Sequence, residues 1–315
     1  MTGGAGFIGS VLCRRLVSAG HRVVAYDNLS RGRREFLPPG VRLVEGDIRD
    51  RARLAETIAA TRAERVIHLA AMHFIPDCVA RPAETLDVNV EGTRAVLESC
   101  RGGWVRAFVF ASTAAVYAPC DGPCVEDSTP LGPLEVYGES KVQGERLVRA
   151  FHEETRLSVS IARLFNAVGP RETNAHVIPH IFESLRASDE LRLGNLEPRR
   201  DYIDTRDVAD ALLALSARPP GLHVFNVGTG AAYSVGDIVA VLRRILGRPI
   251  AVVQDPARVR PVERMLLLAD TGRIRREAGW APRIGLEQSL DGLVREYGLR
   301  VERPEAAAED GRGSS

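Results

Sequence analysis

The chain has 315 residues and a mass of 34.3 kDa, enough for one large α/β unit or two unequal domains. Its 42 Lys plus Arg and 41 Asp plus Glu give a formal net charge of +1, which argues against a nucleic-acid or anionic-membrane partner and favours a small molecule. The cysteines form no CxxC pair, and the sequence shows no secretory signal or membrane-spanning apolar run, so we predict a reducing, cytoplasmic compartment.

Short β-rich runs alternate with longer helical patterns through the first half of the chain. The runs are HRVVAYD, VRLVEGD, RVIHLAA, AFVFAST and LSVSIARLFN, and the segments between them include RLAETIAATR and ETLDVNVEGTRAVLESC. Because the runs are nearly continuous in apolar residues, both faces of each strand are expected to be buried. The alternation predicts an α/β fold with a doubly wound, Rossmann-type parallel sheet.

After Asn166 the alternation weakens, which predicts a smaller C-terminal lobe for substrate across the carboxyl edge of the sheet. We expect residues 1–166 to form the dinucleotide-binding domain, with 201–230 returning to it. Residues 167–200 and 231–303 would form the substrate lobe. The almost fully polar residues 304–315 are predicted to be a disordered tail.

The chain opens with a glycine-rich turn, TGGAGFIG, in which Gly3, Gly6 and Gly9 form a GxxGxxG pattern before the apolar helix pattern SVLCRRLVSAG. Such glycines allow a tight turn and a close approach of main-chain N–H groups to a pyrophosphate, which the helix N-terminus also attracts. A turn of this kind normally follows a buried strand, yet only two residues precede Gly3. The first strand is therefore expected to be truncated here.

Acidic residues end the next two β-rich runs. Asp27 follows the third glycine by 18 residues, the place of a carboxylate that binds the adenosine ribose of NAD, and Asp47 in GDIRD fits an adenine contact. The nearby Arg31, Arg33 and Arg34 fit the extra phosphate of NADP instead. Because Asp27 would repel that phosphate, we favour NAD.

A second constellation is YGESK, in which Tyr137 and Lys141 share one face of a helix. A nearby ammonium together with an oxidised nicotinamide would lower the phenol pKa from its usual value of about 10, so that the phenol exchanges a proton with a sugar hydroxyl. Ser112 and Thr113 end the run FVFAST, where a hydroxyl can share the same substrate oxygen. The alternative is an exposed Tyr and Lys on a solvated helix.

With these features the sequence resembles the extended short-chain dehydrogenase/reductase family, and within it the UDP-glucose 4-epimerase-like nucleotide-sugar enzymes. The resemblance spans the chain. It is carried by TGGAGFIGS, DNLSRG, GDIRD, HLAA, NVEGT, FASTAAVY, YGESK, RLFNAVGPR, RRDYIDTRDVADA, FNVGTG, RPVE and GWAPRIGLEQSL.

The resemblance implies NAD as cofactor, a UDP-sugar as substrate and a homodimer. Tyr137 would be the acid/base, Lys141 would lower its pKa and hold the nicotinamide ribose, and Thr113 would bind the reacting hydroxyl. The implied cofactor contacts are Gly3, Gly6, Phe7, Ile8, Gly9, Asp27, Asn28, Asp47, Ile48, Leu69, Ala70, Ala71, Asn89, Tyr137 and Lys141.

The implied substrate contacts are Ser112, Thr113, Asn166, Arg171, Arg200, Arg260, Glu263 and Leu267. Asn166 matches a contact to the sugar-proximal diphosphate, Arg200 and Arg260 match diphosphate clamps, and Glu263 matches an acid that binds the nucleoside ribose. For each arginine the alternative is simple surface solvation. Arg171 is a conjectured partner for a C6 carboxylate, and Leu267 is a small gate that could admit a C2 acetamido group.

The residues after Thr113 separate the reactions within the family. Dehydratases and many decarboxylases carry an acid there, whereas this chain has Ala114 and Ala115, which favours C4 epimerisation through a 4-keto intermediate. A one-way nucleotide-sugar dehydrogenase or reductase, a decarboxylase, and a non-catalytic NAD-binding protein remain alternatives. The sequence does not decide whether the sugar is glucose, N-acetylglucosamine or glucuronate, or whether the nucleotide is UDP or dTDP.

Three smaller expectations complete the sequence analysis. His73 lies where some epimerases have a lysine near the cofactor, and an ordinary loop histidine is an equally good reading. Cys120 and Cys124 flank a Gly-Pro turn, but with no second ligand pair we predict neither a metal site nor a disulfide. Met1 occupies the place of a family valine, so we expect the true protein to begin some residues earlier.

Overall fold

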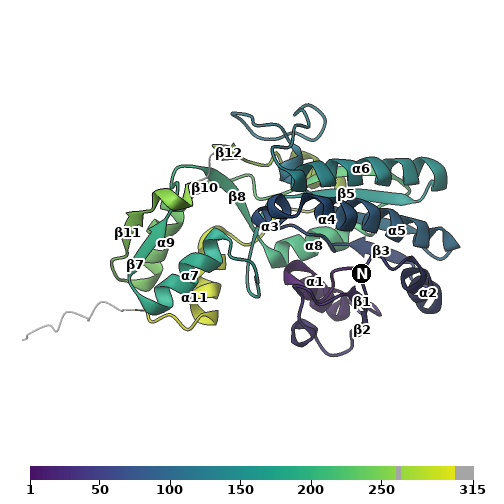
Figure 1. Cartoon of the computed structure of the whole chain (residues 1–315), viewed down its shortest axis with the longest axis horizontal. Helices are drawn as coiled ribbons and strands as arrows, with labels where there is room; N and C mark the ends of the chain where they lie inside the picture. The colour runs from purple at the N-terminus through teal and green to yellow at the C-terminus, as the bar shows by residue number, and fades with distance from the viewer. Residues whose placement is uncertain (260–263, 302–315) are drawn as a thin grey trace, which may run out of the picture.

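The computed structural model describes residues 1–259 and 264–301, and it places a large α/β layer beside a smaller lobe (Figure 1). The strands of the large layer are β1 (Val24–Asp27), β2 (Arg42–Glu45), β3 (Arg65–His68), β4 (Ala107–Thr113), β5 (Ser158–Leu164) and β9 (Gly221–Val227). Strands β3, β4, β5 and β9 pair in that order, and β1 pairs with β2, all in parallel.

The place between β1 and β3 is taken by Met1 and Thr2. Thr2 forms parallel bridges with Tyr26 in β1 and His68 in β3, and the Met1 amino group donates to the Val24 oxygen. The strands thus run across the molecule as β2, β1, Thr2, β3, β4, β5 and β9. This order confirms the predicted doubly wound parallel sheet, with a single bridging residue at the position of the first strand.

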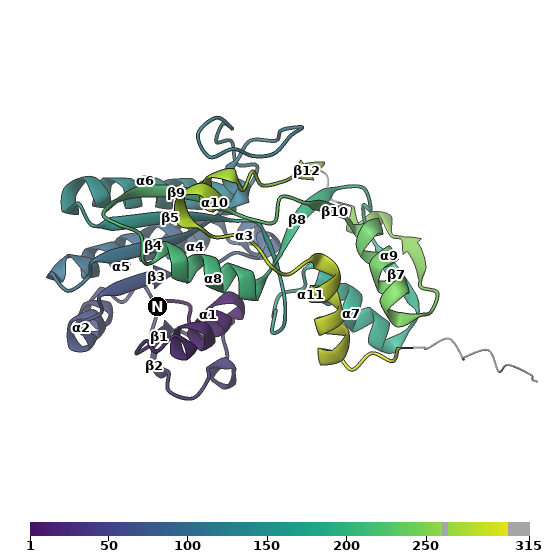
Figure 2. The same cartoon turned by 180° about the vertical axis from the view of Figure 1, so that it is seen from behind.

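Helices cover both faces of this sheet, as Figures 1 and 2 show from opposite sides. One face carries α2 (Arg51–Thr61), α5 (Gly92–Ser99) and α6 (Val136–Thr155), and the other carries α1 (Phe7–Ser18), α8 (Thr205–Leu215) and α10 (Gly272–Ala278). Side chains of β4 alternate between the two cores, since Phe108 and Phe110 pack under α5 and α6 while Val109 packs under α1 and α8. The apolar runs of the sequence therefore reflect strands buried on both faces.

The connection after β3 brings three short helical segments against α6. They are α3 (Ile75–Ala80), α4 (Pro82–Leu86) and a π-helical stretch, Asp87–Glu91, that leads into α5. Pro76 and Pro82 each stand in the first turn of their helix, where a missing N–H costs nothing. Short 3-10 helices lie at Arg34–Phe36, Cys100–Gly102, Ala114–Val116 and Pro256–Arg258.

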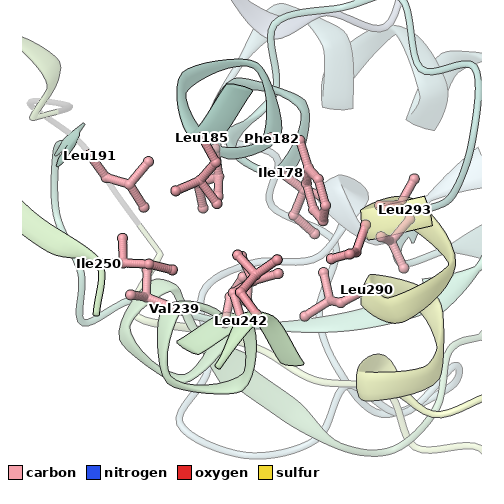
Figure 3. Close-up of a cluster of buried hydrophobic side chains, with 14 of the residues drawn as sticks. Ile178, Phe182, Leu185, Leu191, Val239, Leu242, Ile250, Leu290 and Leu293 are labelled. Carbon is pink, nitrogen blue, oxygen red and sulfur yellow. The ribbon is translucent and has the colours of Figure 1, made fainter. Parts of the chain in front are cut away.

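The smaller lobe has its own core. It contains α7 (Val177–Ala187), α9 (Val235–Leu246), α11 (Leu286–Glu296) and the parallel pair β7 (Glu190–Leu193) and β11 (Ala251–Gln254). Aliphatic side chains from these elements point toward one another, as Figure 3 shows. Ser234 and Asp237 form a capping box that starts α9, which accounts for the sharp beginning of that helix.

A second small sheet lies between the two parts. Its strands are β6 (Asn166–Val168), β8 (Arg199–Asp204), β10 (Ala232–Ser234) and β12 (Leu266–Leu267), and β8 pairs with each of the other three. In Figure 1, β8 passes from the lobe toward the large layer.

Several predictions from the sequence concern these parts of the fold. Residues 221–227 pair with β5 and so lie in the main sheet, while residues 304–315 lie outside the described residues. Cys120 and Cys124 are free thiols with Sγ atoms 3.7 Å apart. Within residues 1–259 and 264–301, helices that combine the length and apolarity needed to span a membrane do not occur.

Candidate active site

A cavity of about 640 Å³ runs along the carboxyl ends of the strands, where doubly wound folds bind ligands. The glycine-rich turn and the ends of β1, β3 and β4 line it from the large layer. Residues of β6, α7, β7 and β8 line it from the other side. The cavity is thus shared by the two parts of the molecule and has the size of a site for a small organic ligand.

The glycine-rich turn is closely packed. Gly3 has a φ of 69°, and a Cβ atom there would lie 2.7 Å from the Ala70 nitrogen. A Cβ atom on Gly9 would lie 2.0 Å from the Gly3 oxygen, so only glycine fits. Gly6 caps the N-terminus of α1 and lines the cavity, which leaves the helix N-terminus open to an anion. This cradle fits the diphosphate of a dinucleotide.

Two carboxylates stand where the adenosine half of a dinucleotide would lie. Asp27 is buried at the end of β1, and its two oxygens accept hydrogen bonds of 2.9 Å from the nitrogens of Ala5 and Leu29. Asp47 accepts from Arg49 and from the Asn28 amide, and the hydrogen bonds with Arg49 lower the pKa of Asp47 to about 2. Asp47 is therefore ionised at neutral pH.

The arginines that fit an NADP phosphate are engaged with acids instead. Arg31 pairs with Asp77, and Arg34 pairs with Glu45. Arg33 lies 3.9 Å from Glu35. Together with the Asp27 carboxylate, this arrangement suits a ribose without the extra phosphate.

Most of the predicted cofactor contacts line the cavity. These are Gly3, Gly6, Phe7, Ile8, Gly9, Asp27, Asn28, Asp47, Ile48, Leu69, Ala70, Ala71, Tyr137 and Lys141. Asn89 does not line it. Its buried amide exchanges two 2.8 Å hydrogen bonds with the main chain of Met72 and donates to the Ser140 hydroxyl, so it ties the loop after β3 to α6.

Tyr137, Lys141 and Thr113 meet in the cavity. Tyr137 shares a side-chain hydrogen bond with Thr113, the last residue of β4. Lys141 is buried one turn further along α6, where its ammonium donates a 2.8 Å hydrogen bond to the Ala111 oxygen and lies 4.9 Å from the centre of the Phe110 ring. Lys141 is also the only lysine in the sequence. The predicted convergence of the three residues is present.

Burial determines the pKa values of Tyr137 and Lys141. Burial raises the pKa of Tyr137 to about 12, although the hydrogen bond with Thr113 opposes the change. Burial also lowers the pKa of Lys141 to about 8. The expected lowering of the phenol pKa is therefore not produced by the protein alone, because desolvation outweighs the hydrogen bond with Thr113, and the Lys141 ammonium is directed at Ala111. A further positive charge, on an oxidised nicotinamide, would be needed to lower the phenol pKa.

Ser112 was predicted to contact substrate, but its hydroxyl is used elsewhere. It lines the cavity wall and donates a 2.6 Å hydrogen bond to the buried carboxylate of Glu145. Thr113 keeps its hydroxyl at the cavity, where it also accepts a 3.2 Å hydrogen bond from the Ala115 nitrogen. Of the two adjacent hydroxyls, Thr113 is the one placed for a ligand.

The remaining predicted substrate contacts divide into three groups. Asn166, Arg200 and Leu267 line the cavity. Arg171 is not among its lining residues, because its guanidinium donates to the Phe36 oxygen and stacks on the Phe36 ring. Arg260 and Glu263 lie outside the described residues.

One arginine that the sequence analysis did not single out reaches the cavity. Arg264 is buried, lines the cavity and donates hydrogen bonds to the main-chain oxygens of Ala115 and Tyr117. It therefore braces the loop that follows Thr113. Its position directly after the RPVE motif was the available signal.

The opposite wall holds a polar cluster that the sequence analysis also left out, apart from His73. Glu172 accepts from the Asn174 amide and lies 3.3 Å from the His176 ring nitrogen. The Asn174 amide also lies 3.0 Å from a ring nitrogen of His73, and burial lowers the pKa of His73. A further carboxylate, Glu135, lines the cavity just before α6. Glu172, Asn174 and His176 stand two residues apart in the loop before α7, whereas His73 and Glu135 come from two other segments that no sequence spacing joins to it.

Comparison with known proteins agrees with this geometry. The sequence profile of the NAD dependent epimerase/dehydratase family matches residues 1–228. A UDP-glucose 4-epimerase of Streptomyces lividans is 34% identical over 299 residues, which cover 90% of each protein.

Two solved structures extend the likeness to the fold. The UDP-glucose 4-epimerase of Thermotoga maritima, crystallised with UDP-glucose, is 30% identical and superposes with a TM-score of 0.87 over 94% of this chain and 97% of that one. The protein MoeE5, in complex with UDP-glucuronic acid and NAD, is also 30% identical, with a TM-score of 0.84 over 94% and 97% of the two chains.

Proposed function

The chain belongs to the NAD dependent epimerase/dehydratase family, and from this premise we propose that it inverts C4 of a UDP-hexose with NAD as cofactor. The observation that carries the proposal is the meeting of Tyr137, Thr113 and Lys141 in the same cavity that the glycine cradle lines. A dinucleotide lying along this cavity would bring its nicotinamide to the phenol. The relatives named above support the choice of substrate.

In the proposed reaction Thr113 and Tyr137 bind the C4 hydroxyl of the sugar, and the Tyr137 oxygen takes its proton. Bound NAD would accept the C4 hydride and later return it to the opposite face, with no net redox change. Lys141 would bind the nicotinamide ribose through its ammonium. Tyr137 gives the proton back to the 4-keto sugar when C4 is reduced.

Inversion requires that the sugar turn while the nucleotide stays bound. Asn166 and Arg200, which line the cavity, are proposed to hold the diphosphate together with Arg260, and Glu263 is proposed to bind the nucleoside ribose. Ala114 and Ala115 beside Thr113 place no acid at the position that dehydratases use. This supports a reaction limited to hydride and proton transfer at one carbon.

We propose that different segments of the chain bind the cofactor and the substrate. Residues 1–166 and 201–230 would bind NAD, and residues 167–200 and 231–303 would bind the UDP-sugar. We also propose a cytoplasmic homodimer, which the family resemblance supports; light scattering of the purified chain would measure its mass in solution. Glucose, N-acetylglucosamine and glucuronate are the sugars to compare, since relatives were crystallised with UDP-glucose and with UDP-glucuronic acid.

The test is proton NMR of the protein incubated with NAD and each UDP-sugar separately, with absorbance followed at 340 nm. The H4 signal of the inverted sugar, without net NADH, would support the proposal and identify the sugar. Stoichiometric NADH would indicate a dehydrogenase, and loss of C6 would indicate a decarboxylase. Either result would contradict the proposed epimerisation.

A further inference from the structure

A buried ion pair lies directly beneath the reacting residues. The Arg163 guanidinium on β5 donates to both oxygens of Glu145 on α6, with distances of 2.9 and 2.8 Å. Both side chains are almost completely enclosed, with an exposed fraction of 2% for each. Buried charges of this kind are costly to desolvate, so a pair placed here calls for a role beyond stability.

Glu145 reaches toward the reacting residues in two ways. Its carboxylate accepts the 2.6 Å hydrogen bond from Ser112, the residue next to Thr113 on β4. On α6 it follows Lys141 by four residues and Tyr137 by eight, so all three share one face of the helix. One side chain thus connects the end of β4 with the helix that carries the reacting pair.

Arg163 extends the connection to the loop beyond Thr113. Its guanidinium also donates a 3.0 Å hydrogen bond to the Tyr117 hydroxyl and a 3.1 Å hydrogen bond to the Glu126 oxygen. The Tyr117 hydroxyl in turn donates to Asn226 on β9 at 2.6 Å. All polar ends of the pair are therefore satisfied within the fold, and they join α6, β4, β5 and β9 at a single point.

We propose that Glu145, held by Arg163, is a positioning residue for the reaction: it fixes Thr113 through Ser112 and places a negative charge one helical turn from Lys141. The effect on turnover rests on the proposed function, whereas the effect of the Glu145 charge on Lys141 does not. It can be measured in the protein without any substrate.

The groups that face Lys141 make the direction of the effect clear. Burial lowers the pKa of Lys141, while the negative charges of a Cys78 thiolate on α3 and of Glu145 raise it. The other titratable groups near the ammonium are Tyr137, His68 on β3 and His73 in the following loop, and burial keeps both histidines neutral. Removing the carboxylate would also leave Arg163 unpaired, and its positive charge would act in the same direction.

The single lysine makes a direct measurement possible. Protein labelled with [13Cε, 15Nζ]lysine gives one side-chain signal, that of Lys141, whose titration can be followed in the complete chain. In Glu145→Gln we expect its pKa to fall by about one unit from the value of the unmodified protein. The matched control is Glu153→Gln, the same change at an exposed site of α6, which should leave the pKa unaltered.

A separate variant tests the connection from Glu145 to Thr113. Ser112→Ala removes the hydrogen bond to Glu145 but leaves the ion pair intact, so it remains informative if Glu145→Gln fails to fold. We expect kcat for epimerisation to fall about tenfold with KM and the melting temperature nearly unchanged, because only the placement of Thr113 is altered. Arg163→Lys, which keeps a cation, should retain more activity than Arg163→Met.

The proposal is overturned if folded Glu145→Gln shows the same lysine pKa as Glu153→Gln, or if Ser112→Ala keeps the full kcat. A protein that shows the predicted lysine titration but epimerises no sugar would contradict the proposed function and leave the electrostatic role of Glu145 supported. The two failures are therefore distinguishable.

Discussion

The ammonium of Lys141 donates a 2.8 Å hydrogen bond to the main-chain oxygen of Ala111, two residues before Thr113 on the same strand. This contact fixes α6 against the end of β4. It also places the only lysine of the chain where burial lowers its pKa to about 8. The site thus holds a cation in an unfavourable environment close to the residue expected to transfer the proton.

Replacing Lys141 with Met should therefore stabilise the folded protein. A pKa lowered from 10.5 to about 8 means that the folded state holds the charged lysine at a cost of about 3 kcal/mol at pH 7. In Lys141→Met this cost is absent, so the free energy of unfolding should rise by up to that amount, while epimerisation is lost.

The stability gained in Lys141→Met should depend on pH in a defined direction. The unfolded chain binds the lysine proton up to about pH 10.5, whereas the folded chain releases it near pH 8. The advantage of Lys141→Met is thus complete below about pH 8 and fades between pH 8 and 10.5. Urea unfolding at pH 7 and pH 10 measures it, and a variant less stable than the parent at both values would contradict the account.

Tyr137→Phe should abolish turnover without emptying the cofactor site. Loss of an acid/base typically costs about 10²- to 10⁴-fold in rate, whereas the cradle and Asp27, which are proposed to bind the adenosine and diphosphate part of the dinucleotide, are unchanged. The measurements are kcat by NMR and NAD affinity by calorimetry. Tyr233→Phe removes a hydroxyl outside the cavity and serves as the control. Full activity in Tyr137→Phe would exclude the phenol as the acid/base.

Leu267→Tyr should narrow the substrate end of the cavity. Leu267 lines the cavity from β12, while its neighbour Leu266 is not among the lining residues. We expect kcat/KM to fall at least about tenfold more for UDP-N-acetylglucosamine than for UDP-glucose, because the acetamido group needs the space. Leu266→Tyr is the matched control. An equal loss for both sugars would show that Leu267 does not discriminate between them.

Gly9→Ala should disrupt the cofactor cradle. The added methyl group would lie 2.0 Å from the Gly3 oxygen, so the turn must shift, at a cost of about 3 kcal/mol. Both the melting temperature and the amount of bound NAD should fall. Gly292→Ala, in an exposed turn of α11 with nothing within 4 Å of the new atom, should instead gain about 1 kcal/mol. Normal NAD binding by Gly9→Ala would contradict the assignment of the cradle.

Local patterns predicted the large layer well because its strands are buried on both faces and its helices are amphipathic. They also placed Gly3, Asp27, Thr113 and Tyr137 correctly around one cavity, since strand ends and helix starts meet at the same edge of a parallel sheet. Contacts that depend on the direction of a side chain could not be read in this way. Arg171, for example, has a φ of 69° and turns to Phe36.

The residues missed by the sequence analysis share a different cause. Arg163 and Glu145 lie on a strand and a helix 18 residues apart, and nothing in either segment alone indicates that they pair. Ser112 was predicted to contact substrate because a hydroxyl at a strand end is common in such sites. Its hydroxyl instead donates a hydrogen bond to the buried carboxylate of Glu145. The spacing of Tyr137, Lys141 and Glu145 was the one available sign, since all three fall on one helical face.

The most direct test of the proposed chemistry uses a UDP-sugar deuterated at C4. If hydride leaves C4 and returns within one binding event, the inverted product should retain the deuterium at C4, with no net NADH and no hydrogen gained from solvent. Proton and deuterium NMR of the product measures both points at once. Loss of the deuterium to solvent, or its accumulation in released NADH, would contradict the proposed mechanism.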